Sequence, residues 1–372
     1  TTRACNSYNK LGGEFPQGMW HQLIEGMRDL EVQTEKVFGE FSNPLLVSVR
    51  SGGKVSMPGM MDTILNLGLN DETVNGLAQT SGGERFAYDS YRRFIQMFGK
   101  VVLEIPREEF ETVLDEYKKR VGAVSDSEVS AEGWKEMVAE FKSLVRKETQ
   151  KEFPQDPYEQ LRLAVKAVFD SWNGKPAVDY RNFYGISHDL GTAVNVVAMV
   201  FGNMDENSGT GVVFTRNPST GEKHLYGEYL FNAQGEDVVA GTRTPQNIAQ
   251  LAQVSPELYR QLNEIAQRLE TRYRDTQDME FTIERGVLYM LQTRVAERTA
   301  GAAVKIAVDM KTEGLITKEE ALKRVEPLQI NQILLPRFDE KAKEQASAVG
   351  DMLAKGLNAS TGAASGKSRV ES

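Results

Sequence analysis

The sequence predicts a protein of the α+β class, because helical and strand-like segments fall into separate blocks along the chain. Apolar residues recur at helical spacing through several long segments between residues 70 and 172. By contrast, residues 192–232 and 278–293 contain short runs rich in β-branched and aromatic residues, separated by Gly, Asn and Pro. Beyond residue 294 the chain becomes rich in Ala, Lys and Glu and returns to a helical pattern. Such segregation of helices and strands is typical of α+β proteins.

Length and composition exclude several classes of protein. A chain of 372 residues suggests two or three domains, and 40% hydrophobic with 26% charged residues is typical of a soluble globular protein. The net charge of −9 argues against nucleic-acid binding, which needs a basic face. One cysteine, Cys5, excludes an internal disulfide, and with only three histidines a zinc site is disfavoured. The longest apolar run, residues 193–201, is too short to span a membrane, and no signal peptide is visible, so we expect a cytoplasmic protein, or an organellar one in a eukaryote.

The first block contains a helix and a buried strand. Residues 15–38 place apolar side chains at helical spacing after Pro16, and residues 44–49 are short, apolar and β-branched. This predicted strand runs into residues 50–59, which contain too much Gly and Pro for regular structure.

A block of helices follows from about residue 70. Its last helix begins most clearly, because Asp156 can cap the amino end, Pro157 fits the first turn and Glu159 can complete a capping box.

The third block is rich in strands, which we expect at residues 192–201, 211–215 and 224–232. A helix is predicted from Ser255 and Pro256 to about Tyr273, followed by a hairpin of residues 278–283 and 287–293. The motif 209–211 (GTG) could cover a nucleotide, but a tight turn is the favoured interpretation. The chain ends in a linker-like stretch, residues 358–367.

The predicted hairpin carries a candidate metal site. Asp278 and Glu280 lie two residues apart on a strand, so both carboxylates project from one face and could hold Mg²⁺. A three-residue loop, 284–286, would pair Asp278 with Gln292 and Glu280 with Met290, and would place Arg294 on the same surface. A two-residue loop would send Gln292 and Arg294 to the other face. The alternative interpretation is a solvated hairpin face without a ligand.

Two further segments could meet phosphate. Arg50 follows the buried strand and opens the Gly-rich segment, where a guanidinium and backbone N–H groups could approach an anion; the alternative is an exposed loop arginine. Residues 366–368 (GKS) look like the end of a P-loop, but the motif needs Gly where this chain has Thr361, which argues against one.

Several longer motifs closely resemble the pyruvate, phosphate dikinase family. They are residues 46–52 (LVSVRSG), 56–70 (SMPGMMDTILNLGLN), 85–93 (RFAYDSYRR), 209–223 (GTGVVFTRNPSTGEK), 232–241 (NAQGEDVVAG) and 277–281 (QDMEF). The resemblance covers roughly residues 1 to 365. The SMPGMMDT run disfavours the related phosphoenolpyruvate synthases, which share SVRS and then diverge.

The resemblance implies a fold and an activity. That family converts ATP, phosphate and pyruvate to AMP, diphosphate and phosphoenolpyruvate through a phosphohistidine, and its amino-terminal part has the ATP-grasp fold. We therefore expect a first ATP-grasp subdomain from residues 1–69 and 155–201, a helical subdomain over 70–154 and a second ATP-grasp subdomain over 202–297. A helical linker over 298–357 and the start of a phosphohistidine domain, or a tail, over 358–372 would follow.

The resemblance also implies the site residues. Arg50 and Arg294 would be catalytic, contacting the transferring phosphates, and Asp278 and Glu280 would hold Mg²⁺. Around the nucleotide and its phosphates we expect seven further residues: Gly59, Met61, Arg93, Thr210, Glu228, Glu236 and Gln292.

The same resemblance implies partners and leaves alternatives open. The family's histidine-carrying segment, its pyruvate-binding barrel and its glycine-rich turn with a phosphate-binding lysine have no counterpart in this sequence, which implies a part truncated at both ends. ATP and phosphate would be the ligands, with the phosphohistidine and pyruvate-binding domains of a homodimeric full-length enzyme as partners. The alternatives are the ATP-binding part of another dikinase, such as phosphoenolpyruvate synthase, or a non-catalytic nucleotide-binding fragment.

Overall fold

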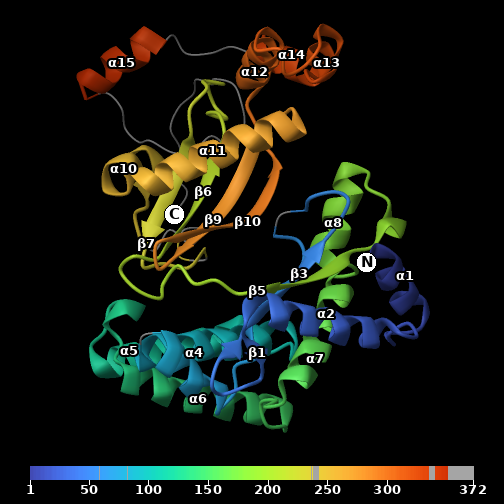
Figure 1. Ribbon diagram of the computed structural model, residues 1–372, viewed down its shortest axis with the longest axis vertical. Coiled ribbons are helices and arrows are strands. Elements are labelled where there is room, and N and C mark those ends of the chain that lie inside the picture. The colour runs from blue at the N-terminus through green and yellow to red at the C-terminus, as the bar shows by residue number, and fades with distance from the viewer. Residues whose placement is uncertain (58, 82, 236, 238–242, 335–339, 351–372) are drawn as a thin grey trace, which may run out of the picture. The chain divides into compact units, whose positions relative to one another are not determined.

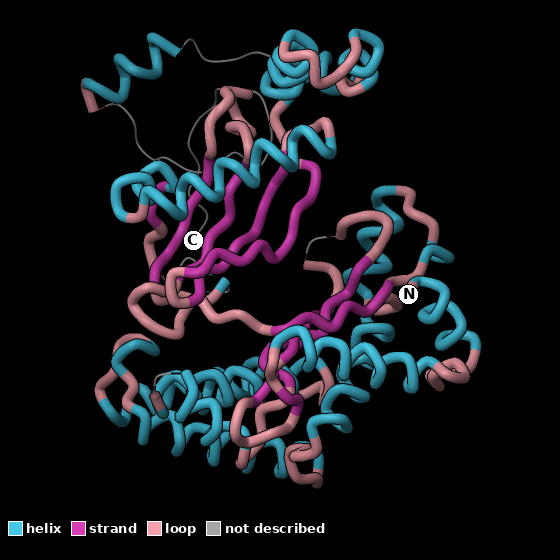
Figure 2. Tube along the Cα trace, in the orientation of Figure 1, coloured by secondary structure: helices cyan, strands magenta, loops and turns pink. Residues whose placement is uncertain are grey.

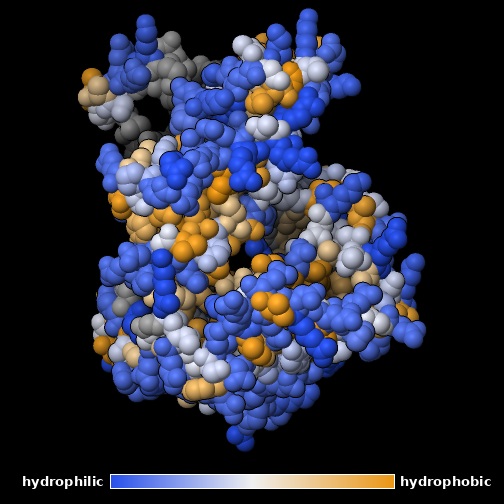
Figure 3. All heavy atoms as spheres, viewed as in Figure 1, coloured by the Kyte–Doolittle hydropathy of each residue, from blue (hydrophilic) through white to orange (hydrophobic). Residues whose placement is uncertain are grey.

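The computed structural model describes residues 1–57, 59–81, 83–235, 237, 243–334 and 340–350. It is a mixture of helices and strands, as the α+β class requires, and it divides into two compact units, Thr1–Val200 and Phe201–Ser372 (Figures 1 and 2). Within the described residues, no helix is both long enough and apolar enough to cross a bilayer. Most of the surface visible in Figure 3 is hydrophilic, in keeping with the many charged residues of the chain.

The first unit contains a three-stranded antiparallel sheet. Its central strand β3 (Val47–Gly52) pairs with β4 (Thr63–Leu67) on one side and with β5 (Ala193–Ala198) on the other. Helix α7 (Pro157–Ser171) packs against all three strands. The remaining elements around this sheet are α1 (Thr2–Lys10), α2 (Met19–Thr34), α8 (Lys175–Tyr184), the 3-10 turn η2 (His188–Leu190) and the parallel pair β1 (Val37–Phe38) and β2 (Pro44–Leu45).

The same unit includes a block of helices between β4 and α7. Helix α4 (Glu84–Val101) packs against α3 (Thr73–Ser81), α6 (Ala131–Thr149) and strand β4. The block is completed by α5 (Arg107–Val121) and the 3-10 turn η1 (Asp126–Glu128). Its apolar stripes meet in an aromatic core, in which Phe94, Phe98 and Phe153 pack edge to face with ring centroids 5.5 Å apart.

Helix α7 begins where the sequence predicts, but with a simpler cap. The side chain of Asp156 accepts hydrogen bonds from the backbone N–H groups of Tyr158 and Glu159, and Pro157 occupies the first turn. The predicted capping box is wrong, because both carboxylate oxygens of Glu159 accept from the guanidinium of Arg162 one turn later, at 2.7 Å. A charge-assisted bidentate pair competes successfully with a single bond to the backbone.

The second unit contains a five-stranded antiparallel sheet in the order β10-β9-β6-β7-β8. The strands are β6 (Gly209–Phe214), β7 (Tyr226–Phe231), β8 (Gln246–Asn247), β9 (Gln277–Glu284) and β10 (Val287–Val295). Helices α10 (Ile248–Val254) and α11 (Pro256–Tyr273) lie across one face of this sheet (Figure 1). Leu258 and Leu262 of α11 pack there with Val213, Met279 and Phe281 of the strands.

The motif at residues 209–211 lies inside strand β6, so the predicted tight turn is wrong. A Cβ atom on Gly211 would lie 2.6 Å from the carbonyl oxygen of Glu228 and 2.7 Å from the ring of Phe281. The glycine is therefore needed for the close approach of neighbouring strands and of the Phe281 ring, not for a turn.

We predict that Gly211→Ala lowers the free energy of unfolding by about 1–3 kcal/mol, because the added methyl group has no space within this packed face. Urea denaturation followed by circular dichroism measures the change. The matched control is Gly301→Ala in helix α12 (Ala300–Thr312), where, apart from the adjoining helix backbone, no described atom lies within 4 Å of the added Cβ, and where alanine should be neutral or mildly stabilising. Equal effects of the two substitutions would contradict this account of Gly211.

The hairpin β9–β10 has a two-residue loop, so the predicted three-residue loop is wrong. Glu284 pairs with Val287 across Arg285 and Gly286, which both have positive φ, at 51° and 80°. This geometry matches the twist of a two-residue hairpin. With such a loop, a regular ladder would place Gln292 on the opposite face from Glu280. Instead, the register shifts between Met290 and Gln292, so that Gln292 pairs with Glu280 and Arg294 with Asp278. A β-bulge therefore restores the predicted shared face by a different route.

Helices follow the sheet of the second unit: α12, α13 (Lys318–Lys323), α14 (Pro327–Ile333) and α15 (Glu340–Ala348). The guanidinium of Arg216, just after β6, is fully buried and binds Glu270 of α11 and Glu313 at the end of α12. This ion cluster joins α12 to the sheet and to its covering helix. The predicted linker-like stretch and the P-loop-like residues 366–368 lie outside the described residues.

Candidate functional site

The face of the second sheet opposite α10 and α11 gathers six of the predicted site residues. Residues directly opposite one another on paired strands share a face of the sheet. Two rows of such partners run across β7, β6, β9 and β10: Glu228–Val212–Glu280–Gln292 and Tyr226–Phe214–Asp278–Arg294. The next row begins Leu230–Thr210–Thr282. Asp278, Glu280, Gln292, Arg294, Glu228 and Thr210 thus lie on one surface.

Asp278 and Arg294 form the central ion pair of this surface. The Nε of Arg294 donates to Oδ2 of Asp278 at 2.7 Å, and the Asp278 side chain is almost fully buried. Burial alone would lower the pKa of Arg294, but the hydrogen bond to Asp278 and the charges of Asp278 and Glu280 raise it. The guanidinium therefore remains a fixed positive charge on this face.

The donors on this face fit a magnesium ion. The second carboxylate oxygen of Asp278, Oδ1, is buried and has no hydrogen-bond partner within the described part of the chain. A buried carboxylate oxygen without a partner is costly, and a cation would satisfy it. Glu280 lies two residues away on the same face, and Gln292 lies opposite it. No cluster of three or more His, Cys, Asp or Glu residues suited to a metal occurs among the described residues.

The other predicted residues of the second unit differ in accessibility. Thr210 is almost fully buried, and its hydroxyl donates to the carbonyl oxygen of Phe281 at 3.1 Å. Glu228 is exposed in the row that contains Glu280. Glu236 lies outside the described residues. Its predicted place at the nucleotide stays a prediction.

In the first unit, Arg50 lies near the end of the central strand β3. It pairs with Thr63 of β4 and Asn195 of β5, and its side chain is partly exposed. The chain then enters the segment that contains Gly59 and Met61. Gly59 is exposed and has a φ of +70°, and apart from its chain neighbours no atom of the described residues lies within 4 Å of a Cβ built on it, which leaves its backbone open to a ligand.

Arg93 lies on helix α4 and is engaged with acidic residues of the same helical block. Its Nε donates to Oδ2 of Asp89 at 3.2 Å, and its Nη2 lies 3.9 Å from Oδ2 of Asp126. The neighbouring Arg92 binds the same two carboxylates and stacks on Trp134, 4.5 Å from the ring centroid. These contacts give Arg93 a structural role, and its contact with the nucleotide stays a prediction.

The aromatic residues of the site surface were not predicted from the sequence. Phe214 pairs with Asp278 on one side and with Tyr226 on the other, and the two rings lie 6.5 Å apart. Alternation along residues 210–214 would have indicated that Thr210, Val212 and Phe214 share a face. That signal was hidden because Gly209 and Gly211 suggested a turn.

The chain matches the family described as pyruvate phosphate dikinase, AMP/ATP-binding domain, over residues 11–254 and 248–315. It is 52% identical to the pyruvate, phosphate dikinase of Rhizobium meliloti over 98% of this chain and 41% of that protein. The enzyme of the same name from Clostridium symbiosum is 53% identical over 99% of this chain and 42% of that protein. The chloroplastic pyruvate, phosphate dikinase 1 of Arabidopsis thaliana is 51% identical over 99% and 38%.

The chain thus spans about 40% of the length of these relatives. The family match and the alignments with these relatives each cover far more than half of this chain. We conclude that this chain belongs to the family of pyruvate phosphate dikinase AMP/ATP-binding domains.

Proposed function

We propose that this chain is the ATP-binding part of a pyruvate, phosphate dikinase and that it performs the nucleotide half of the reaction. A histidine outside this chain would attack the β-phosphorus of ATP, so that AMP leaves and the β- and γ-phosphates pass together to the histidine as a diphosphoryl group. The observation that supports this proposal most strongly is the sheet face with Asp278, Glu280, Gln292 and Arg294, on which Oδ1 of Asp278 is buried without a partner.

In this proposal the residues of the face act through charge and position. Asp278 and Glu280 would hold Mg²⁺, which would neutralise negative charge on the phosphates. Arg294 is kept protonated by its carboxylate neighbours and would donate hydrogen bonds to the transferring phosphates. Gln292, opposite Glu280, would orient a phosphate oxygen, and Arg50 would contribute a second guanidinium. Phosphoryl transfer depends mainly on such positioning and charge stabilisation.

The proposal also assigns an organisation to the chain. The sheets of the two units would be the two ATP-grasp subdomains, over residues 1–69 with 155–201 and over 202–297. The helices between 70 and 154 would be an inserted subdomain, and those between 298 and 357 a linker towards the phosphohistidine domain. ATP and phosphate would be the ligands, the other domains of a homodimeric enzyme the partners, and the cytoplasm or an organelle the location.

Calorimetric titration with ATP tests the proposal. We expect ATP binding to require Mg²⁺. Arg50→Lys should weaken ATP binding by about tenfold or more, because a point charge cannot reproduce the bidentate contact of a guanidinium with phosphate. Arg107→Lys is the matched control, since Arg107 is exposed on α5 and pairs with Glu111 one turn away. ATP binding that is insensitive to both Mg²⁺ and Arg50→Lys would contradict the assignment.

A second expected result concerns the isolated chain. It should form no phosphoenolpyruvate and no acid-labile phosphohistidine from β-labelled ATP, because none of its three histidines lies in the sequence context of the family's carrier histidine. Labelling quenched at alkaline pH, where phosphohistidine persists, followed by mass spectrometry measures this. Stoichiometric label on His21, His188 or His224 would overturn the proposed division of labour.

A further inference from the structure

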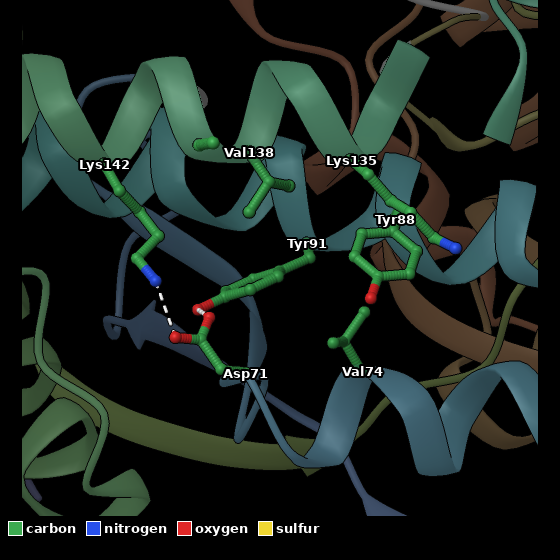
Figure 4. A pocket seen from close by; sticks show the side chains of 8 residues that line it. Asp71, Val74, Tyr88, Tyr91, Lys135, Val138 and Lys142 are labelled. Atoms are coloured by element: carbon green, nitrogen blue, oxygen red, sulfur yellow. Dashed lines mark hydrogen bonds and ion pairs between the residues drawn. The ribbon is translucent and has the colours of Figure 1, made fainter. Parts of the chain in front are cut away.

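One buried arginine of the first unit has no carboxylate partner. Other shielded cations of this unit are paired with carboxylates. Figure 4 shows Lys142 beside Asp71, to which its ammonium donates at 2.6 Å. Arg92 binds Asp126 at 2.9 Å. Arg181 of α8, in contrast, has no exposed surface and forms no ion pair with any described carboxylate. A buried charge is costly unless other groups hydrogen-bond to it, so its remaining contacts carry that task.

Neutral groups of Trp172 and His188 hold Arg181. The guanidinium lies over the indole ring of Trp172, 3.9 Å from the ring centroid, and its Nη1 donates to the carbonyl oxygen of Trp172 at 2.7 Å. Its Nε donates to Nδ1 of His188 at 3.0 Å. The indole N–H of Trp172 donates in turn to the carbonyl oxygen of His188 at 3.1 Å. We call these three residues the His188 latch, because they join the end of α7, helix α8 and the turn η2.

The contact with Arg181 fixes the protonation state of His188. Nδ1 can accept a hydrogen bond only if it carries no proton, so the single ring proton must be on Nε2. Nε2 lies 3.0 Å from Oδ1 of Asn182, an acceptor, so this neutral tautomer satisfies both ring nitrogens. Burial lowers the pKa of Arg181, but an arginine side chain stays charged in folded proteins. His188 is therefore the member of the latch that can change its charge.

A second proton on His188 would break its bond with Arg181. An imidazolium ring donates from both nitrogens and accepts at neither. It would also bring a second positive charge to within 3.0 Å of the guanidinium Nε. Because the His188 residue is exposed, the protonated ring can move into water, whereas the fully buried Arg181 cannot follow it. The guanidinium would then lose its acceptor at Nε, beside an Nη2 that already has no partner among the described residues.

No described carboxylate compensates a protonated His188. The ionisable residues on the elements around it are Arg3, Cys5, Tyr8 and Lys10 of α1, Asp170 near the end of α7, Lys175, Asp179, Tyr180 and Tyr184 of α8, and Asp189 of η2. Asp170 accepts from the hydroxyl of Tyr8 at 3.1 Å, and Asp179 pairs with Lys175. Asp189 is exposed to solvent, and burial raises the pKa of the Cys5 thiol, which keeps it neutral.

The turn held by the latch leads directly into the sheet. Thr192 follows η2 and precedes β5, and its Oγ1 accepts from the backbone N–H of Gly52 at 3.2 Å. Gly52 ends β3 and pairs with Ala193 of β5. The position of the turn therefore affects the end of the central strand, where the Gly-rich segment begins.

We propose that the His188 latch is a pH-sensitive device, which holds residues 186–191 in place while His188 is neutral and releases them when His188 gains a second proton. Protonation favours the released state, so the latch is closed at neutral and alkaline pH and opens as the pH falls.

The test follows the turn in this chain by hydrogen–deuterium exchange and by the NMR signal of the Trp172 indole N–H, between about pH 8 and about pH 5, the range in which an ordinary imidazole titrates. We expect exchange of the amides in residues 186–191, corrected for the intrinsic effect of pH on exchange, to become about tenfold faster or more. A hydrogen bond to a charged group is typically worth at least that factor. The indole signal, assigned with Trp172→Phe, should shift over the same range, because its acceptor lies on His188.

Three variants separate the latch from a general effect of acid. His188→Asn keeps an acceptor near the place of Nδ1 but cannot titrate, so the turn should stay protected at every pH. His188→Ala has no acceptor, so the turn should exchange rapidly at every pH. His21→Asn is the matched control, since His21 is exposed on α2 beside Glu25 and its loss should leave the response to pH unchanged.

Three results would overturn the proposal. The first is protection of residues 186–191 that does not change with pH in the unaltered chain. The second is an unaltered pH response in His188→Asn. The third is protection in His188→Ala that equals that of the unaltered chain at neutral pH. Circular dichroism checks that each variant keeps its fold.

Discussion

Replacing Asp278 by asparagine should lower AMP formation by the full-length protein at least about 100-fold while leaving the fold intact. The substitution keeps the shape of the side chain, and its amide can still occupy the place beside Arg294. What disappears is the negative charge on a buried group whose Oδ1 has no other partner in the described structure. Without that charge, a magnesium ion and the phosphates it neutralises are held less tightly. The effect should therefore be larger on turnover than on stability.

The measurement is AMP release from ATP with the purified full-length protein, at several Mg²⁺ concentrations. Glu280→Gln should act in the same direction, because Glu280 projects from the same face. Asp309→Asn is the control, since Asp309 lies on α12 in an ordinary surface pair with Lys305. Wild-type rates in both Asp278→Asn and Glu280→Gln at saturating Mg²⁺ would contradict the assignment of these carboxylates to the metal.

Local signals in the sequence predicted the elements of this fold well. The start of α7 at Pro157 and the span of α11, Pro256–Tyr273, follow from capping residues and from apolar spacing within a few residues. The strands β6, β7 and β9 lie within the segments rich in β-branched and aromatic residues. Each of these features depends on neighbours in the chain, which the sequence displays directly.

The register of the hairpin could not be predicted in the same way. Its loop length and its bulge at Leu291 are independent features of the register. The two-residue loop alone would turn Gln292 and Arg294 to the other face of the sheet, and the bulge turns them back. Nothing local marks Leu291 as an unpaired residue. The packing of Met290 against the core on one side and the Asp278–Arg294 pair on the other favour the bulge. Both depend on contacts across the sheet that only the folded chain makes.

The ion cluster at Arg216 was also invisible in the sequence, because its partners lie 54 and 97 residues further along the chain. Arg216 has no exposed surface, and it binds both oxygens of Glu270 and both oxygens of Glu313 at 2.8–3.0 Å. Glu270 is itself buried. Removing the guanidinium of Arg216 would leave the carboxylate of Glu270 buried without a compensating charge. This is the most damaging way to break a buried ion pair.

Arg216→Met should therefore destabilise the second unit by about 3–5 kcal/mol. Arg260→Met is the matched control. Arg260 also binds two carboxylates, Glu257 and Glu264, but on the exposed surface of α11, so its loss should cost far less stability than the loss of Arg216. The three tryptophans, at positions 20, 134 and 172, all lie in the first unit, so their fluorescence follows that unit during denaturation. Circular dichroism follows both units.

The decisive comparison is Arg216→Met with the double variant Arg216→Met/Glu270→Met. If the loss of stability comes from the stranded charge of Glu270, the second substitution should restore part of it, because it replaces that carboxylate by an apolar group. In Arg216→Met, we expect part of the circular dichroism signal to be lost before the tryptophan fluorescence changes. In the double variant, the two transitions should lie closer together. If the double variant is instead less stable than Arg216→Met, then Glu270 stabilises the unit through its bond with Thr215, and the buried charge is not the cause.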